Sequence, residues 1–284
     1  MRMRHWRPCT SIRSKEASEV VDSENPTKLD IDLKDDIRQT FIVMKYEMIK
    51  FMTGKKIYIY GIVNIIALAA MAVALFINSN SVTTEGALRS FISLLNLILL
   101  IGATLFSSVT LVSEFEEKTS LVLFTKPIRR ASIFFGKFLA AYILNFGFTV
   151  VYYILAAIVV LIKTGGFTPN MFISIAFCMP YIFALTGIAM FFSSVMKKSS
   201  SASILTFVFL LLVPSIITTI VVAIKGNITE DSFYLWYMID TAWTIIPDSI
   251  AGQAKDVALE ILVMLIWGIV PTAIACRVFR KKQI

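Results

Sequence analysis

The hydrophobic residues of this 284-residue chain gather into six long stretches that are separated by shorter polar segments. Each stretch is long enough, at ~1.5 Å of helix rise per residue, to cross a hydrocarbon core of about 30 Å. A backbone in hydrocarbon must pair its own polar groups, which favours helices. We therefore predict an all-α integral membrane protein with six transmembrane helices, over about residues 57–77, 91–112, 138–162, 171–195, 204–224 and 257–276.

The segment before the first stretch divides into two parts. Residues 1–31 mix charged residues, Ser and Pro without apolar periodicity, which predicts a flexible cytoplasmic tail. Residues 32–56 are predicted to form an amphipathic helix lying in the membrane interface, with residues 57–284 as the transmembrane domain. A soluble helix packed on a neighbouring domain is the alternative. Apolar residues recur every three or four positions in this helix, at Ile37, Phe41, Met44, Met48 and Phe51, while Arg38, Lys45 and Glu47 point elsewhere.

Composition and charge agree with a membrane protein. Hydrophobic residues make up 57% of the chain, charged residues 16%, and the mean hydropathy is +0.78. The net charge of +8 could indicate nucleic acid, but basic residues beside apolar spans also orient membrane proteins, and we expect no nucleic-acid partner. Of the 27 Lys and Arg residues, 23 fall before the first span, between spans two and three, between spans four and five, or after the last. We therefore predict a multi-pass protein of the cell membrane with both termini in the cytoplasm.

The spans and the outer segments offer few chemical groups. Only Glu260 is ionisable within a predicted span, which disfavours an internal proton relay. The outer loop 225–256 is rich in aromatic residues, including Trp243 at the expected interface, and it carries the glycosylation sequon at Asn227. The asparagines inside the spans are expected to bridge helices rather than bind ions, and they are Asn64, Asn96 and Asn145.

No pattern for catalysis or cofactor binding is found. The three cysteines lack metal or redox spacing, the single histidine is His5 in the tail, and no GxxxxGK[ST] phosphate loop occurs. We therefore expect no cofactor and no metal, and we expect a transport protein rather than an enzyme. Its energy would have to come from another subunit.

The densest charged run between two spans covers residues 114–137. Such a run cannot lie in hydrocarbon, so it must lie in water at a membrane face. It also holds an apolar patch, from Leu121 to Phe124, which a segment that only anchors helix ends in lipid headgroups would not need. The run therefore predicts a docking surface for a partner.

Three short motifs in this run resemble the cytoplasmic connection between the second and third spans in permease subunits of type-2 ATP-binding-cassette (ABC) transporters. They are Glu114-x-Glu116-x-x-Thr119, Pro127-x-x-Arg130 and Gly136-Lys137. The predicted layout from residue 32 to the C-terminus is similar as well. The resemblance implies a homodimer of permeases with two separate ABC ATPase subunits, in contact with membrane lipid and acting in export. The loop 114–137, here called the coupling loop, would dock on the ATPase.

The resemblance assigns the ATPase-coupling role to the seven motif positions, and Leu121 and Phe124 of the apolar patch are added to them. The two acids would pair with basic groups of the ATPase or of the interfacial helix, the threonine would cap a short helix, and the proline would turn the chain. Arginine would bind the acids or lipid phosphate, glycine would let another helix approach, and the final lysine would reach back to the interface. These positions are Glu114, Glu116, Thr119, Leu121, Phe124, Pro127, Arg130, Gly136 and Lys137.

Two other functions remain open from the sequence. A permease-like subunit could assist assembly or maturation of a partner complex without moving solute. An interfacial membrane enzyme could use Glu116 and Glu117 together with Asp256 or Glu260 as acids, although the predicted topology places these on opposite sides of the membrane.

Overall fold

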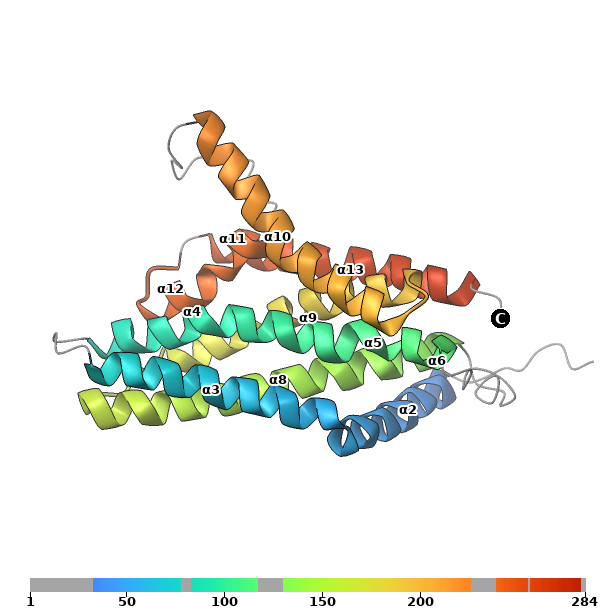
Figure 1. Cartoon of the computed structure of the whole chain (residues 1–284), viewed down its shortest axis with the longest axis horizontal. Coiled ribbons are helices and arrows are strands. Elements are labelled where there is room, and N and C mark those ends of the chain that lie inside the picture. The colour runs from blue at the N-terminus through green and yellow to red at the C-terminus, as the bar shows by residue number, and fades with distance from the viewer. Residues whose placement is uncertain (1–32, 78–82, 117–129, 226–238, 255, 282–284) are drawn as a thin grey trace, which may run out of the picture. The chain divides into compact units, whose positions relative to one another are not determined.

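The computed structural model describes residues 33–77, 83–116, 130–225, 239–254 and 256–281 (Figure 1). Within these ranges the chain is helical and forms no strand, and six helices are long and apolar enough to cross a membrane. The predicted fold class is thereby confirmed. The long helices are α3 (Lys55–Ile77), α4 (Thr84–Gly102), α8 (Arg130–Thr164), α9 (Met171–Val195), α10 (Ser199–Lys225) and α13 (Val257–Lys281).

Four of the long helices begin before the predicted hydrophobic stretches, and the difference is largest for α4 and α8. Helix α4 starts at Thr84 because Thr83 Oγ1 accepts a hydrogen bond from Gly86 N at 3.2 Å, which caps the first turn. Helix α8 starts at Arg130, two turns before the apolar stretch. Hydropathy reports only the part of a helix that hydrocarbon can hold, so polar end turns are missed.

The second span is irregular in its second half. Helix α4 passes into a π-helix, η1 (Ala103–Ser107), then α5 (Ser108–Thr110) and α6 (Val112–Glu116). At the join, a Cβ on Gly102 would lie 2.3 Å from Asn145 Oδ1 and 2.7 Å from Tyr60 Oη. Glycine therefore lets the first and third spans bring polar side chains against the second. Tyr60 is fully buried here, 0% exposed, although its neighbour Tyr58 faces outward.

Helix α2 (Leu33–Thr53) precedes the first span, and Gly54 separates the two. From Arg38 onward the chain forms one compact unit, to which the contacts below belong. The predicted apolar face of α2 divides in the structure. Met48 and Phe51 pack on the core, and the Phe51 ring lies 5.5 Å from that of Phe106, whereas Phe41 is exposed.

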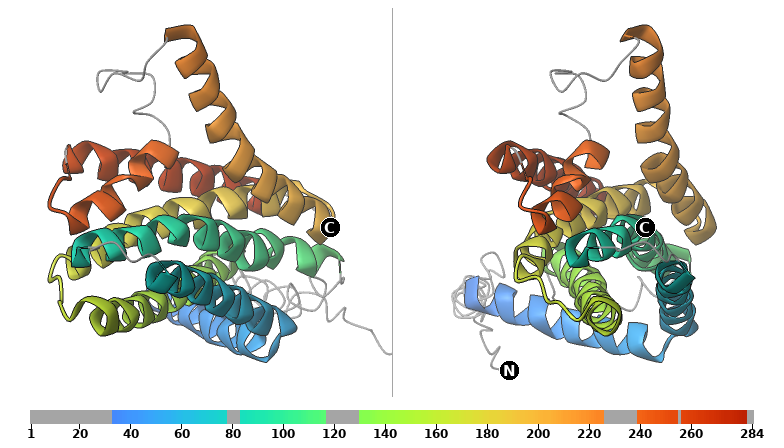
Figure 2. Two further views of the ribbon diagram at one scale, coloured as in Figure 1. Left: turned by 60° about the vertical axis from the view of Figure 1, so that its left-hand side comes forward. Right: turned by 90° about the vertical axis from the view of Figure 1, so that its left-hand side faces the viewer.

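Helix α9 is the centre of the packing, in contact with α8, α10 and α13 (Figure 2). A Cβ on Gly187 of α9 would lie 2.6 Å from Gly268 O of α13, so these two helices approach closely. Asn96 Oδ1 accepts a hydrogen bond from Tyr181 Oη at 2.6 Å and so bridges α4 and α9, as predicted. Asn64 instead donates to Tyr60 O of its own helix, at 2.8 Å.

Two short helices lie within the outer loop predicted over 225–256. They are α11 (Ile239–Trp243) and α12 (Ile245–Ile250), and both pack against α9. The expectation that Trp243 is an interfacial anchor is wrong. Its side chain is 5% exposed and its ring centroid lies 4.7 Å from that of Tyr181, because α11 folds back onto the bundle. The sequon at Asn227 lies outside the described residues.

Candidate functional site

Five of the nine predicted coupling residues lie at the two described ends of the coupling loop. Glu116 ends α6, whereas Arg130, Gly136 and Lys137 lie in the first two turns of α8. Of Glu114 only the backbone is described, within α6. The other predicted positions, Thr119, Leu121, Phe124 and Pro127, lie outside the described residues.

Glu116 binds the start of the fifth span. Its Oε2 accepts hydrogen bonds from Ser199 N at 3.0 Å and from Ser199 Oγ at 2.5 Å. These bonds lower the pKa of the Glu116 carboxyl below its usual range, and the positive charge of Lys198 acts in the same direction. The carboxylate therefore caps the N-terminus of α10, where a negative charge is favoured, and joins the loop to that span.

Arg130 joins the start of the third span to the end of the sixth. Its guanidinium Nη1 donates to Arg280 O in the last turn of α13, at 3.2 Å. The last carbonyls of a helix have no partner within it, so an arginine side chain is a suitable donor. The contact of Arg130 with the loop acids or with lipid phosphate stays a prediction.

Lys137 does not reach back to the interface, contrary to our expectation. Its side chain is 1% exposed, and Nζ lies 3.1 Å from Glu47 Oε1 on α2. It also donates to Thr110 O at the end of α5, at 3.4 Å. The sequence placed Glu47 away from the packed face of α2, but the helix turns it inward and buries it. Removing one member of such a pair leaves a buried charge, at a cost of about 3–5 kcal/mol.

Gly136 lies where α2 crosses α8. A Cβ at this position would lie 2.8 Å from both Thr40 O and Val43 Cβ. Because one of these atoms belongs to the backbone, a side chain could be accommodated only if α2 moved. This contact agrees with the predicted role of glycine in letting another helix approach.

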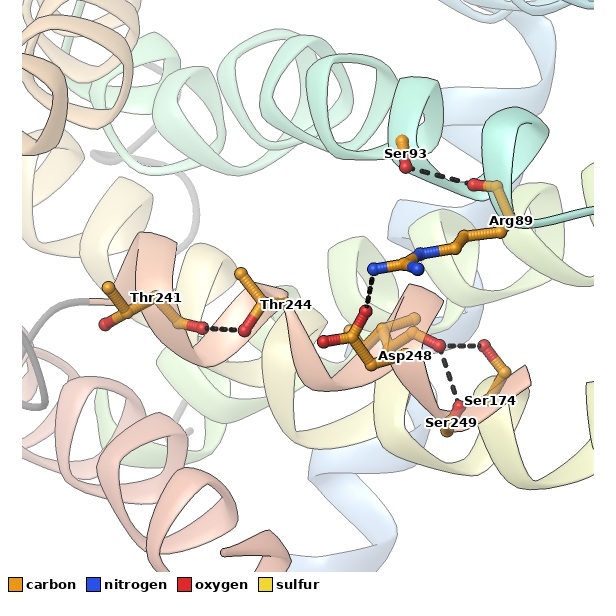
Figure 3. Close-up of polar contacts among 8 residues, drawn as sticks. Arg89, Ser93, Ser174, Thr241, Thr244, Asp248 and Ser249 are labelled. Carbon is orange, nitrogen blue, oxygen red and sulfur yellow. Dashed lines mark hydrogen bonds and ion pairs between the residues drawn. The ribbon is translucent and has the colours of Figure 1, made fainter. Parts of the chain in front are cut away.

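Sequence reasoning missed a second polar cluster, which holds α12 against α4 and α9 (Figure 3). The Arg89 guanidinium of α4 forms an ion pair with Asp248 of α12. Ser174 Oγ of α9 donates to Ile246 O at 2.7 Å, and Asn170 Nδ2 donates to Ile250 O at 3.1 Å. Arg89 was notable in the sequence only as one of four basic residues outside the cytoplasmic segments, which carried no information about its partner.

The described ends of the coupling loop and the Arg89–Asp248 cluster lie at opposite ends of the bundle. This arrangement argues against an enzyme that would use Glu116 and Glu260 in one site. Arg130 contacts Arg280 near the end of α13, whereas Glu260 lies in its first turn. At ~1.5 Å per residue, those 20 residues separate the two by about 30 Å. Leu111, five residues before Glu116, packs in one buried cluster with Phe279 near that same end of α13, so Glu116 and Glu260 do not form one carboxylate site. Among the described residues, no three His, Cys, Asp or Glu side chains are grouped in a way that could hold a metal ion.

The fold and the polar ends of its helices define a multi-pass, all-helical membrane protein. The model of the ABC-2 family transporter proteins matches residues 41–284. The chain therefore belongs to the ABC-2 transporter family, and the resemblance to a type-2 ABC permease is confirmed. A search of curated proteins found no match.

Proposed function

We propose that the chain is the permease subunit of an ABC-type exporter in the cell membrane, driven by a separate ATPase that docks on the coupling loop. Family membership supports a permease that works with an ABC ATPase. The observation that carries the assignment to this loop is that both of its described ends are tied to the spans. Glu116 binds Ser199 of α10, and Lys137 binds Glu47 of α2 and Thr110 O.

These contacts supply a route for movement. ATP binding draws two ATPase subunits together, and the loops docked on them move. Each loop acts on α10 through Glu116, and on α2 and the end of α5 through Lys137. A permease homodimer then changes between states open to opposite faces, and ATP biases this equilibrium only through its different affinity for the two states.

The direct test is the variant Glu116→Arg, purified with the ABC ATPase. We expect loss of the ATPase or of permease-dependent ATP hydrolysis, while the permease still inserts. Because Glu116 also caps α10, Ser199→Ala is the matched control: it removes the hydroxyl donor but leaves the carboxylate for the partner. Glu116→Arg with normal ATPase binding and hydrolysis would contradict docking at this loop.

Two substitutions inside the loop test docking without altering the Glu116 contact. Leu121→Asp and Phe124→Asp place a charge in the apolar patch of the loop. We expect both to weaken co-purification of the ATPase, since a charge buried at an interface is costly. Stable binding with ATP hydrolysis, but without a permease-dependent conformational change, would instead favour an assembly subunit.

A further inference from the structure

Helix α2 and the end of α5, which precedes the coupling loop, meet at the buried ammonium group of Lys137, the last residue of the loop. Lys137 of α8 lies 3.1 Å from Glu47 on α2 and donates to Thr110 O at the end of α5, at 3.4 Å. A single side chain at the start of the third span therefore contacts both α2 and the end of α5, four residues before the loop begins.

The residue beside this lysine fixes the same helix crossing. At Gly136 the α8 backbone leaves no space for a Cβ, which would lie 2.8 Å from Thr40 O. The ion pair and the glycine contact are adjacent on α8, and they engage α2 within two turns of each other. Helix α2 is therefore positioned directly against the base of the loop.

Within the part of the chain that the structure describes, the opposite face of α2 has no comparable contact. Its exposed apolar side chains suit lipid rather than water, and they include Phe41, 52% exposed, and Tyr46, 70% exposed. Others on this face are Ile42, Ile49 and Met52. The helix can therefore move along the membrane surface unless its inner face holds it.

An ion pair holds one helix against another in a more strictly defined position than apolar contacts do. Two apolar side chains would hold α2 with similar or greater stability, but they would tolerate sliding. A buried carboxylate opposite a buried ammonium tolerates little displacement, because separation leaves both charges unpaired in a poorly hydrated site. The pair therefore selects one position of α2 relative to the loop.

We propose that Glu47 is a positioning residue for transport: through Lys137 it makes α2 move together with the coupling loop when the ATPase acts. This inference rests on the proposed function, since it needs an ATPase at the loop. It adds a second moving element to the permease. Glu47 acts through Lys137 and does not itself contact the ATPase.

The experiment measures movement of α2 in the complex of permease and ATPase in liposomes. Phe41→Cys, in a background with the native cysteines changed to Ser, is labelled with a maleimide without nucleotide and with ATP plus vanadate. With Glu47 and Lys137 present, we expect the labelling rate to differ between the two conditions. In the double variant Glu47→Leu/Lys137→Met, the difference between these two labelling rates, divided by the amount of bound ATPase, should fall at least about fivefold. A factor of this size corresponds to the loss of a typical coupling free energy.

Three further variants make the result specific. Glu47→Gln keeps an oxygen acceptor for Lys137 and should retain an intermediate response. Arg89→Gln/Asp248→Asn removes the exposed ion pair at the other end of the bundle and should leave the response unchanged. Ser113→Cys, placed beside the loop, reports whether the loop itself responds. The double variant retains apolar packing, so the test does not depend on a protein with a buried unpaired charge.

The outcomes separate this inference from the proposed function. With Glu47 and Lys137 present, a nucleotide-dependent change in labelling at Ser113→Cys but not at Phe41→Cys would overturn the inference alone. An undiminished change at Phe41→Cys in the double variant would do the same. Failure of the ATPase to bind, with no response at either cysteine, would overturn the proposed function. A merely structural ion pair would lower the folded yield without changing the normalised response.

Discussion

The pKa of the Glu116 carboxyl depends on its contact with the start of helix α10. It is exposed to solvent, yet two hydrogen bonds from Ser199 at the N-terminus of α10 favour its ionised form and lower its pKa. A lowered pKa in the folded protein means that the contact stabilises above the pKa of the unfolded chain. The stabilisation is lost as the pH falls through the folded value.

The pH dependence of this contact can be tested by comparing the native chain with Glu116→Gln. At neutral pH we expect the native chain to unfold at the higher temperature in detergent, because only the ionised carboxylate makes charge-assisted bonds with Ser199. The difference should begin to shrink as the pH falls below about 4.3, the usual pKa of a glutamate carboxyl, and should vanish once the pH is low enough to protonate the carboxyl in the folded state as well. A difference that stays constant down to acid pH would show that ionisation plays no part.

A second prediction at this scale concerns Gly102. Its Cβ would lie 2.3 Å from Asn145 Oδ1 and 2.7 Å from Tyr60 Oη, in a buried region beside the π-helix. Gly102→Ala should therefore destabilise the protein by about 1–3 kcal/mol, the usual cost of overpacking. Gly61→Ala is the control, since nothing lies within 4 Å of that Cβ position. Equal thermal stability of the two variants in detergent would contradict the predicted crowding.

Among the elements, α9 and α13 show how two membrane helices associate without a hydrophobic driving force between them. Lipid is as apolar as a side chain, so close backbone approach and dispersion contacts hold such helices together. Gly187 faces Gly268 O and Thr272 Oγ1, and Gly268 faces the ring of Phe183. Both glycines therefore serve the same interface, but their neighbours differ in freedom to move.

That difference gives an order of effects. Gly187→Ala would place a Cβ 2.6 Å from a backbone oxygen, which can shift only with its helix. Gly268→Ala would meet the ring of Phe183 at 2.2 Å, and a side chain can rotate away. We expect Gly187→Ala to lower the unfolding temperature more, with Gly147→Ala, which has nothing within 4 Å, as the neutral reference. The reverse order would show that α13 adjusts more readily than the Phe183 ring.

For the whole molecule, the basic residues predict how the helices are oriented. The topology predicted from the sequence places the coupling loop and the end of α13 on the side that holds 23 of the 27 Lys and Arg residues, which favours the cytoplasm. We expect an impermeant maleimide to label Phe167→Cys in intact cells, since that side chain is 56% exposed between α8 and α9. Lys281→Cys should be labelled only after permeabilisation. The opposite result would reverse the proposed orientation.

Much of this protein follows from the sequence, because the information is local. Hydrophobic length specifies a membrane helix, and the six spans need no knowledge of their neighbours. The short motifs around Glu116 and Arg130 identified the family, which the match over residues 41–284 confirms. Periodicity also placed Met48 and Phe51 on the apolar face of α2, although the expected partner was the membrane interface and both pack on the core.

The tertiary structure decided which distant groups meet. Glu47 and Lys137 are far apart in sequence, and neither position signals the other, so the lysine was expected at the lipid interface instead of in a buried pair. The partners of Glu116 and Arg89, and the burial of Trp243, also depend on how helices pack. Hydrocarbon determines the length and composition of each span by itself, whereas packing and ion pairing depend on all of them together.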